Sequence, residues 1–163
     1  MLGSAHWIDQ IEPALSEFYQ RQPPEQVEQD YLTRVLELAQ AGEFDSLGHL
    51  DLIKRYRPLS MGTFDPLPYA DLIRAILRAI VQRDRAIEIN TSPLRKGLPA
   101  PCPDLTVLRW YRELGGEKLT VGSDAHCARD VGADISTALE LARAAGFGRI
   151  VTFERRKVEW VRL

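Results

Sequence analysis

The chain has 163 residues, of which 45% are hydrophobic and 27% charged, and its 21 basic and 23 acidic residues give a net charge of −2. This length and composition suit one globular domain, which we expect to span residues 1–163. The charge balance gives no reason to expect a nucleic-acid partner, and no apolar run approaches the roughly 20 residues that a membrane span needs. Two cysteines are too few for a disulfide framework, and the first residues lack the regions of a signal peptide, so we expect a cytoplasmic protein.

The first half of the chain is predicted to alternate short strands with helices. The expected elements are a strand end over 1–4, a loop with one or two helical turns over 7–26, a helix over 28–41, a strand over 44–48 and a loop over 50–66. Apolar residues recur at helical spacing before Gly42, which ends the helix. Pro13, Pro23 and Pro24 favour a loop before it.

The second half of the chain continues the alternation. The expected elements are a helix over 67–83, a strand over 86–90, a loop over 91–103, a helix over 104–114, a strand over 118–122, a helix over 130–145, a strand over 149–153 and a short element over 158–161. The helix over 67–83 is the clearest, because Leu72, Ile76 and Ile80 belong to one continuous apolar stripe. Alternating strands and helices predict an α/β fold: a parallel sheet of about five strands with helices outside.

All three histidines of the chain follow predicted strands. His6 follows the first strand end, His49 follows the strand over 44–48, and Asp124 and His126 follow the strand over 118–122. Because the carboxyl ends of parallel strands meet at one edge, we expect these four side chains to converge there.

Imidazole and carboxylate groups are the ligands of divalent ions such as zinc, iron and manganese. Neighbouring ions of this kind lower the pKa of a bound water and clamp the oxygens of a phosphate ester. The pattern therefore favours a metal-dependent phosphoesterase.

Less specific interpretations apply to several of these residues. A histidine at a strand end is often only a capping or surface residue. Glu88, between two isoleucines, either faces solvent or pairs with an arginine, and Asp51 is a candidate cap for the turn after His49. Arg95 is a candidate for a solvated cation, and Cys127 is not expected to be a ligand.

Four segments of the chain resemble motifs of the PHP family (polymerase and histidinol phosphatase), in the order and spacing of its histidinol-phosphatase branch. They are GSAHW at 3–7, GEFDSLGHLD at 42–51, EINTS with LRK at 88–96, and GSDAH at 122–126. The resemblance covers nearly the whole chain.

This resemblance implies a TIM-like (β/α)7 barrel with a centre of up to three zinc, manganese or iron ions. It implies the hydrolysis of L-histidinol phosphate, a small phosphate ester, to L-histidinol and phosphate in histidine biosynthesis. By motif, His6 and His49 would bind one ion, Asp124 a second and His126 a third. Arg95 would contact the substrate phosphate, since a guanidinium suits phosphate oxygens. By the same resemblance, the pocket would be shaped by Asn90, Thr91 and Ser92.

The sequence departs from the family at its start, because the His-x-His motif and the bridging glutamate have no counterpart. We therefore expect an incomplete barrel of about five of the seven strands, truncated at the N-terminus and holding fewer ions. The alternatives are a catalytically incomplete fragment that complements another chain, a binder of metal or metabolite, and a PHP phosphoesterase with another substrate. The open edges of such a barrel also favour a homo-oligomer.

Overall fold

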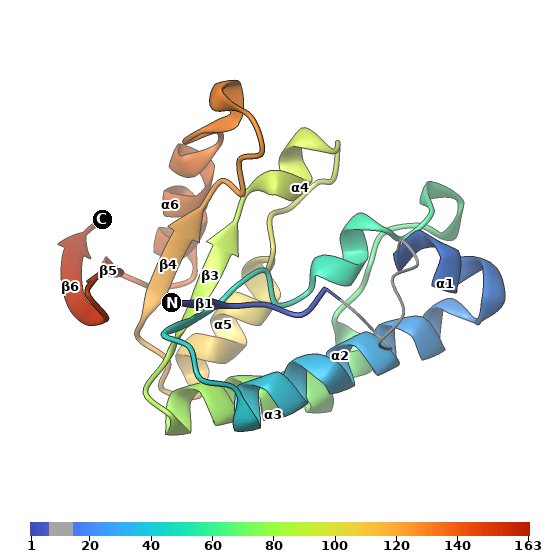
Figure 1. Cartoon of the computed structure of the whole chain (residues 1–163), viewed down its shortest axis with the longest axis horizontal. Helices are drawn as coiled ribbons and strands as arrows, with labels where there is room; N and C mark the ends of the chain where they lie inside the picture. The colour runs from blue at the N-terminus through green and yellow to red at the C-terminus, as the bar shows by residue number, and fades with distance from the viewer. Residues whose placement is uncertain (7–14) are drawn as a thin grey trace.

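A parallel sheet at the centre of the computed structural model positions the candidate residues (Figure 1). The structure describes residues 1–6 and 15–163. The sheet has four strands in the order β1-β2-β3-β4. They are β1 (Leu2–Gly3), β2 (Ser46–Leu47), β3 (Ala86–Asn90) and β4 (Leu119–Gly122). The parallel register aligns their carboxyl ends, so the loops after the strands meet at one edge.

The expected strand over 149–153 forms, but outside the parallel sheet. It is β5 (Arg149–Glu154), which pairs antiparallel with β6 (Lys157–Arg162) in a separate sheet. Arg155 and Arg156 join the two strands with positive φ angles of 49° and 66°. A two-residue turn of this conformation closes a tight hairpin. The α/β fold class is confirmed, while the described part of the parallel sheet has four strands rather than about five.

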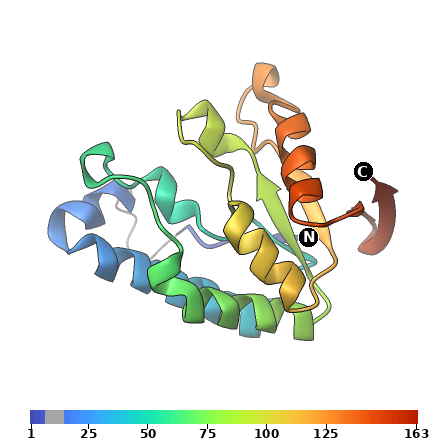
Figure 2. The ribbon, with the colours of Figure 1, turned by 180° about the vertical axis from the view of Figure 1, so that it is seen from behind.

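Helices pack beside this sheet, and Figure 2 shows α5 and α6 in front of β3 and β4 when the molecule is seen from behind. The α-helices are α1 (Leu15–Arg21), α2 (Pro24–Ala41), α3 (Ala70–Gln82), α4 (Ser92–Arg95), α5 (Leu105–Glu113) and α6 (Ile135–Ala144). Short 3-10 helices cover Leu52–Arg55, Leu59–Met61, Leu67–Tyr69 and Ala128–Asp130. Among the described residues, none of these helices is both long and apolar enough to cross a membrane.

Three helix starts differ from the sequence prediction for local reasons. Helix α2 begins at Pro24, four residues early, because proline is tolerated in the first helical turn. Helix α6 begins late, after Gly132 and Asp134 take positive φ angles of 75° and 59°. Helix α4 lies inside the expected loop over 91–103. The part of the expected loop that covers residues 7–14 lies outside the described residues.

The apolar stripe of α3 confirms the clearest helix prediction. Ile73, Ile76, Leu77 and Ile80 are fully buried, and α3 packs along α2. The first turn of the expected segment is a 3-10 helix, which α3 continues. This pair of helices supplies a large share of the core on which the sheet rests.

A buried carboxylate joins α1, α2 and the segment after β2. Glu28 accepts hydrogen bonds from the Tyr19 hydroxyl (3.1 Å) and the Tyr69 hydroxyl (2.7 Å), and it forms an ion pair with Arg57. Arg57 also donates to the carbonyl oxygens of Met61 and Gly62. Burial raises the pKa of both tyrosines above the ordinary value, so their hydroxyls stay protonated as donors.

Helix α5 has a side-chain cap, which gives a first test of the fold. The carboxylate of Asp104 accepts a hydrogen bond from the Val107 backbone N–H at 3.1 Å. Asp104→Ala leaves that N–H without its partner, so we expect the free energy of unfolding to fall by about 1 kcal/mol. Urea denaturation measures this, with Asp104→Asn as the control that retains a capping oxygen. A loss as large in Asp104→Asn would contradict the role of the cap.

Candidate metal centre

Two imidazoles meet at the carboxyl edge of the sheet. His6 follows β1 and His49 follows β2, which are neighbouring strands. Their Nε2 atoms lie 3.2 Å apart and their ring centroids 5.0 Å apart. Two nitrogens that bind one zinc ion tetrahedrally, each at about 2.1 Å, lie roughly 3.4 Å from one another. The separation therefore fits two ligands of one ion as well as it fits a hydrogen bond between the rings.

The surroundings of His49 favour the neutral ring. His49 is 5% exposed, and burial lowers the pKa of its imidazole below the ordinary value. The adjacent His6 lowers that pKa further, whereas Asp124 opposes the shift. Its Nδ1 is buried and has no hydrogen-bond partner among the described residues. A neutral imidazole is the form that binds metal ions.

Asp124 lies on the same edge, bound to an arginine that the motifs did not indicate. Its Oδ2 accepts a hydrogen bond from Arg55 Nη1 at 3.0 Å and lies 3.0 Å from the Ser92 hydroxyl. Arg55 also donates to that hydroxyl at 3.1 Å. The guanidinium therefore neutralises a carboxylate that is one of the expected metal ligands.

His126 stands apart from the other three expected ligands. Its side chain is 83% exposed, and its Nδ1 lies 3.0 Å from the backbone oxygen of Asp124. Cys127 beside it is also exposed. Within residues 1–6 and 15–163, no three ligating side chains of His, Cys, Asp or Glu gather around one point. The structure thus brings His6 and His49 together and places Asp124 and His126 at the rim of the same cavity.

Two adjoining cavities occupy this edge. The first, of about 330 Å³, is lined by all four expected ligands together with Leu2, Ser4, Leu52, Arg55, Tyr56, Glu88 and Asn90. The second, of about 550 Å³, is lined by Arg55, Ser92, Arg95, Lys96, Asp124, His126, Arg129 and Asp130. The shared wall consists of Arg55, Asp124 and His126. The first cavity is thus lined by carboxylate and imidazole groups, and it adjoins the second cavity, whose charged residues are mainly cationic.

The expected phosphate contact, Arg95, holds the loop that carries Asp124. Its Nη2 donates to the carbonyl oxygen of Ser123 at 2.6 Å and lies 3.3 Å from that of Asp124. Its Nε lies 3.6 Å from Asp130 Oδ2, while its Nη1 is buried and has no partner in the described structure. Arg95 therefore holds the backbone at Asp124 and also lines the second cavity.

The three residues that were expected to shape the pocket do not line the same cavity. Asn90 lines the first cavity and Ser92 the second. Thr91 is fully buried and lines neither of the two, because its hydroxyl donates to the carbonyl oxygen of Ala133 at 2.7 Å. Thr91 thus joins the end of β3 to the segment before α6 rather than shaping the pocket.

Glu88 corrects both sequence interpretations, since it neither faces solvent nor pairs with an arginine. It is 7% exposed, and its Oε2 accepts hydrogen bonds from the His49 backbone N–H and from Asn90 Nδ2. Burial raises the pKa of this carboxyl above its ordinary value, against the effect of these two hydrogen bonds. Alternation along a strand shows that Glu88 lies on the opposite face of β3 from Ile87 and Ile89, and that face lines the first cavity.

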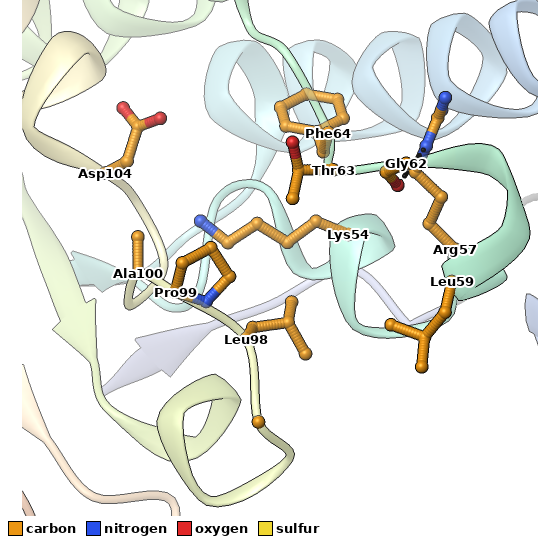
Figure 3. A pocket seen from close by; sticks show the side chains of 11 residues that line it. Lys54, Arg57, Leu59, Gly62, Thr63, Phe64, Leu98, Pro99, Ala100 and Asp104 are labelled. Carbon is orange, nitrogen blue, oxygen red and sulfur yellow. Dashed lines mark hydrogen bonds between the residues drawn. The ribbon is translucent and has the colours of Figure 1, made fainter.

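A third cavity, of about 300 Å³, lies between the segment after β2 and the loop over 97–104, and Figure 3 shows the Lys54 side chain extending across it. Lys54 Nζ donates to Asp51 Oδ2 at 2.8 Å and to the carbonyl oxygen of Pro101. Asp51 is fully buried and forms no cap, contrary to expectation. This cavity contains none of the expected metal ligands.

Comparison with known proteins gives a consistent result. No family model matches the chain. It is 33% identical over 162 residues to a Clostridium acetobutylicum protein named as a probable histidinol-phosphatase, and 31% identical over 165 residues to the histidinol-phosphatase of Lactococcus lactis. Each alignment covers 98% of this chain. The chain spans about three fifths of the length of these relatives, 62% and 60%.

The fold is similar to that of a solved relative. The crystal structure of the Lactococcus lactis histidinol phosphate phosphatase, complexed with zinc, L-histidinol and phosphate, matches 97% of this chain and 60% of that one. The TM-score is 0.81 at 29% sequence identity. The motifs, the parallel sheet and these matches agree, and the chain belongs to the histidinol-phosphatase branch of the PHP family.

Proposed function

We propose that this chain carries part of the active site of a metal-dependent phosphomonoesterase that hydrolyses L-histidinol phosphate to L-histidinol and phosphate. The observation that carries the proposal is the pair of Nε2 atoms of His6 and His49, 3.2 Å apart in a cavity that Asp124 also lines. The relative from Lactococcus lactis, which holds zinc, L-histidinol and phosphate, supports both the metal and the substrate class.

The donor set suits zinc, manganese or iron. By the family motifs, His6 and His49 would hold one ion, Asp124 would contribute to a second and His126 to a third. Bound ions supply Lewis-acid chemistry: they acidify water and polarise phosphoryl oxygens. Imidazole ligands add no charge, so an ion held by His6 and His49 would keep its full positive charge and would favour an anionic ester.

The chain's own cations orient the ester. Arg55 lines both cavities, so its guanidinium can contact a phosphoryl group from the wall between them. Arg95 lines the second cavity and would add a second guanidinium there. Guanidinium groups bind phosphate oxygens through paired, charge-assisted hydrogen bonds. These residues therefore fix the phosphoryl group against the metal-binding side of the site.

A second candidate function is binding of metal and phosphate ester without turnover. The observation in its favour is that no three ligating side chains surround one point in the described residues. Complementation by another chain, or by a second copy, would supply the missing ligands.

Phosphate binding and release by the zinc-loaded chain test the proposal. We expect the chain to bind inorganic phosphate and to release phosphate from L-histidinol phosphate above a zinc-only blank. Arg55→Ala should weaken phosphate binding by about 10- to 100-fold, because a hydrogen bond between charged groups contributes about 1.5–3 kcal/mol. Arg109→Ala, an exposed position on α5, is the matched control.

The outcomes separate the two functions. Calorimetry with inorganic phosphate measures binding, and a colorimetric phosphate assay measures release. Binding that depends on Arg55 without any release would favour the second candidate. A zinc-loaded chain with no affinity for phosphate would refute both.

A further inference from the structure

Glu88 is a buried carboxylate in the middle of the site for which the proposed chemistry has no use. It comes from β3, and its Oε2 reaches across to the loop after β2, where it accepts the His49 backbone N–H at 3.0 Å. The same oxygen accepts a hydrogen bond from Asn90 Nδ2 at 3.1 Å. The Glu88 carboxylate thus holds the backbone of the candidate ligand His49.

The backbone of His49 needs such an anchor. Its φ angle is 23°, which lies in the left-handed region that side chains other than glycine disfavour. Conformations of this kind persist only where the surroundings hold them in place. A hydrogen bond from the N–H to a buried carboxylate is charge-assisted and short enough to do so. It fixes the conformation in which the His49 ring meets that of His6.

The hydrogen bonds continue from Glu88 to the second candidate ligand. Asn90 Oδ1 accepts the Ser92 backbone N–H at 3.0 Å and lies 2.7 Å from the Ser92 hydroxyl. That hydroxyl lies 3.0 Å from Asp124 Oδ2. A single connected network therefore runs from His49 through Glu88 to Asp124.

Gly122 provides the space for this carboxylate. A Cβ built at Gly122 would lie 2.2 Å from Glu88 Oε1, and its three nearest atoms all belong to Glu88. The backbone of Gly122 does not lie in the left-handed region, so the Glu88 carboxylate is the group that a side chain at this position would displace. The glycine that begins the GSDAH segment thus has a physical explanation.

We propose that Glu88 and Gly122 act as one positioning unit, which sets the ring of His49 against that of His6 for a shared divalent cation. This role rests on the proposed metal centre. Glu88 itself is a positioning residue, since it acts on the ion through the backbone of His49.

A double-mutant cycle on zinc affinity tests the unit. Glu88→Ala should weaken zinc binding by about 10- to 100-fold, as the loss of a group that orients a ligand does. Gly122→Ala should weaken it in the same direction, because it displaces the carboxylate. The double variant should bind zinc no more weakly than Glu88→Ala, since no carboxylate remains to be displaced. Glu88→Gln should stay within a few fold of the unmodified chain, because its amide oxygen still accepts the His49 N–H.

Competition with a chromophoric chelator gives these affinities, and circular dichroism of each metal-free variant checks that it folds. Gly148→Ala is the matched glycine control, because a Cβ there meets nothing within 4 Å. Losses that multiply in the double variant would overturn the unit. Equal zinc affinity in the unmodified chain and in Glu88→Ala would do the same.

Amide hydrogen exchange of His49 adds a readout that needs no metal. Its N–H should exchange at least about tenfold faster in Glu88→Ala and at nearly the unmodified rate in Glu88→Gln. Failure of the unmodified chain to bind zinc would overturn the proposed metal centre and this role with it. Zinc binding by the unmodified chain together with unchanged exchange in Glu88→Ala would overturn this role alone.

Discussion

His49→Ala is expected to abolish tight zinc binding by this chain. The substitution removes one of two nitrogens that lie 3.2 Å apart, and the remaining His6 cannot chelate an ion alone. We expect an affinity loss of about 10³-fold or more, larger than the 10- to 100-fold that follows from changes around a ligand. His6→Ala should have a similar effect, and the variant that lacks both rings should be little worse than either single one. Chelator competition monitored by absorbance gives the dissociation constants.

His126→Ala is the matched control for this prediction. Its side chain is 83% exposed, and its Nδ1 lies 3.0 Å from the backbone oxygen of Asp124. We therefore expect the ion bound by that pair to be retained with nearly unchanged affinity. A loss at His126 equal to that at His49 would show that the paired rings are not the primary site.

Glu28→Ala is expected to destabilise the fold more than any surface substitution. The variant leaves the Arg57 cation without its buried partner and removes the acceptor of two tyrosine hydroxyls. Breaking a buried ion pair by removing one partner costs about 3–5 kcal/mol. For a chain of this size, that corresponds to a fall in melting temperature of roughly 10 °C. Thermal unfolding followed by circular dichroism measures it.

Gln29→Ala controls for the change in helix propensity. Gln29 is the exposed neighbour of Glu28 on α2, so its truncation should change the melting temperature by at most about 1–2 °C. Glu28→Gln should fall between the two, because its amide oxygen still accepts one tyrosine hydroxyl. A Glu28→Ala variant as stable as Gln29→Ala would show that the buried network contributes nothing.

The sequence pattern was sufficient to predict a helix with one buried face and the edge of the sheet at which the histidines lie. The stripe that includes Ile76 and Ile80 predicted α3, and alternation of strands with helices predicted that His6 and His49 would share an edge. The first prediction depends on periodicity over a few turns of helix, and the second on the general rule that parallel strands end at one edge of a sheet. The structure confirms the helix and the meeting of the two rings.

The features that the sequence did not reveal depend on contacts between distant segments. Arg55 reaches Asp124 across 69 residues, and no local pattern distinguishes it from a solvated arginine. The burial of Glu88 depends on the space left by Gly122, which only the packing of β3 beside β4 creates. The separate pairing of β5 with β6 follows from the turn at Arg155, whose conformation is unusual for that residue type.

The ion pair between Arg57 and Glu28 also anchors one side of the cavity of Figure 3. Arg57 binds the carbonyl oxygens of Met61 and Gly62, which belong to the segment that forms one side of that space. Outward movement of this segment together with Arg57 would break the ion pair with the buried carboxylate of Glu28. Widening of the cavity on this side would therefore cost part of the free energy that stabilises the folded domain.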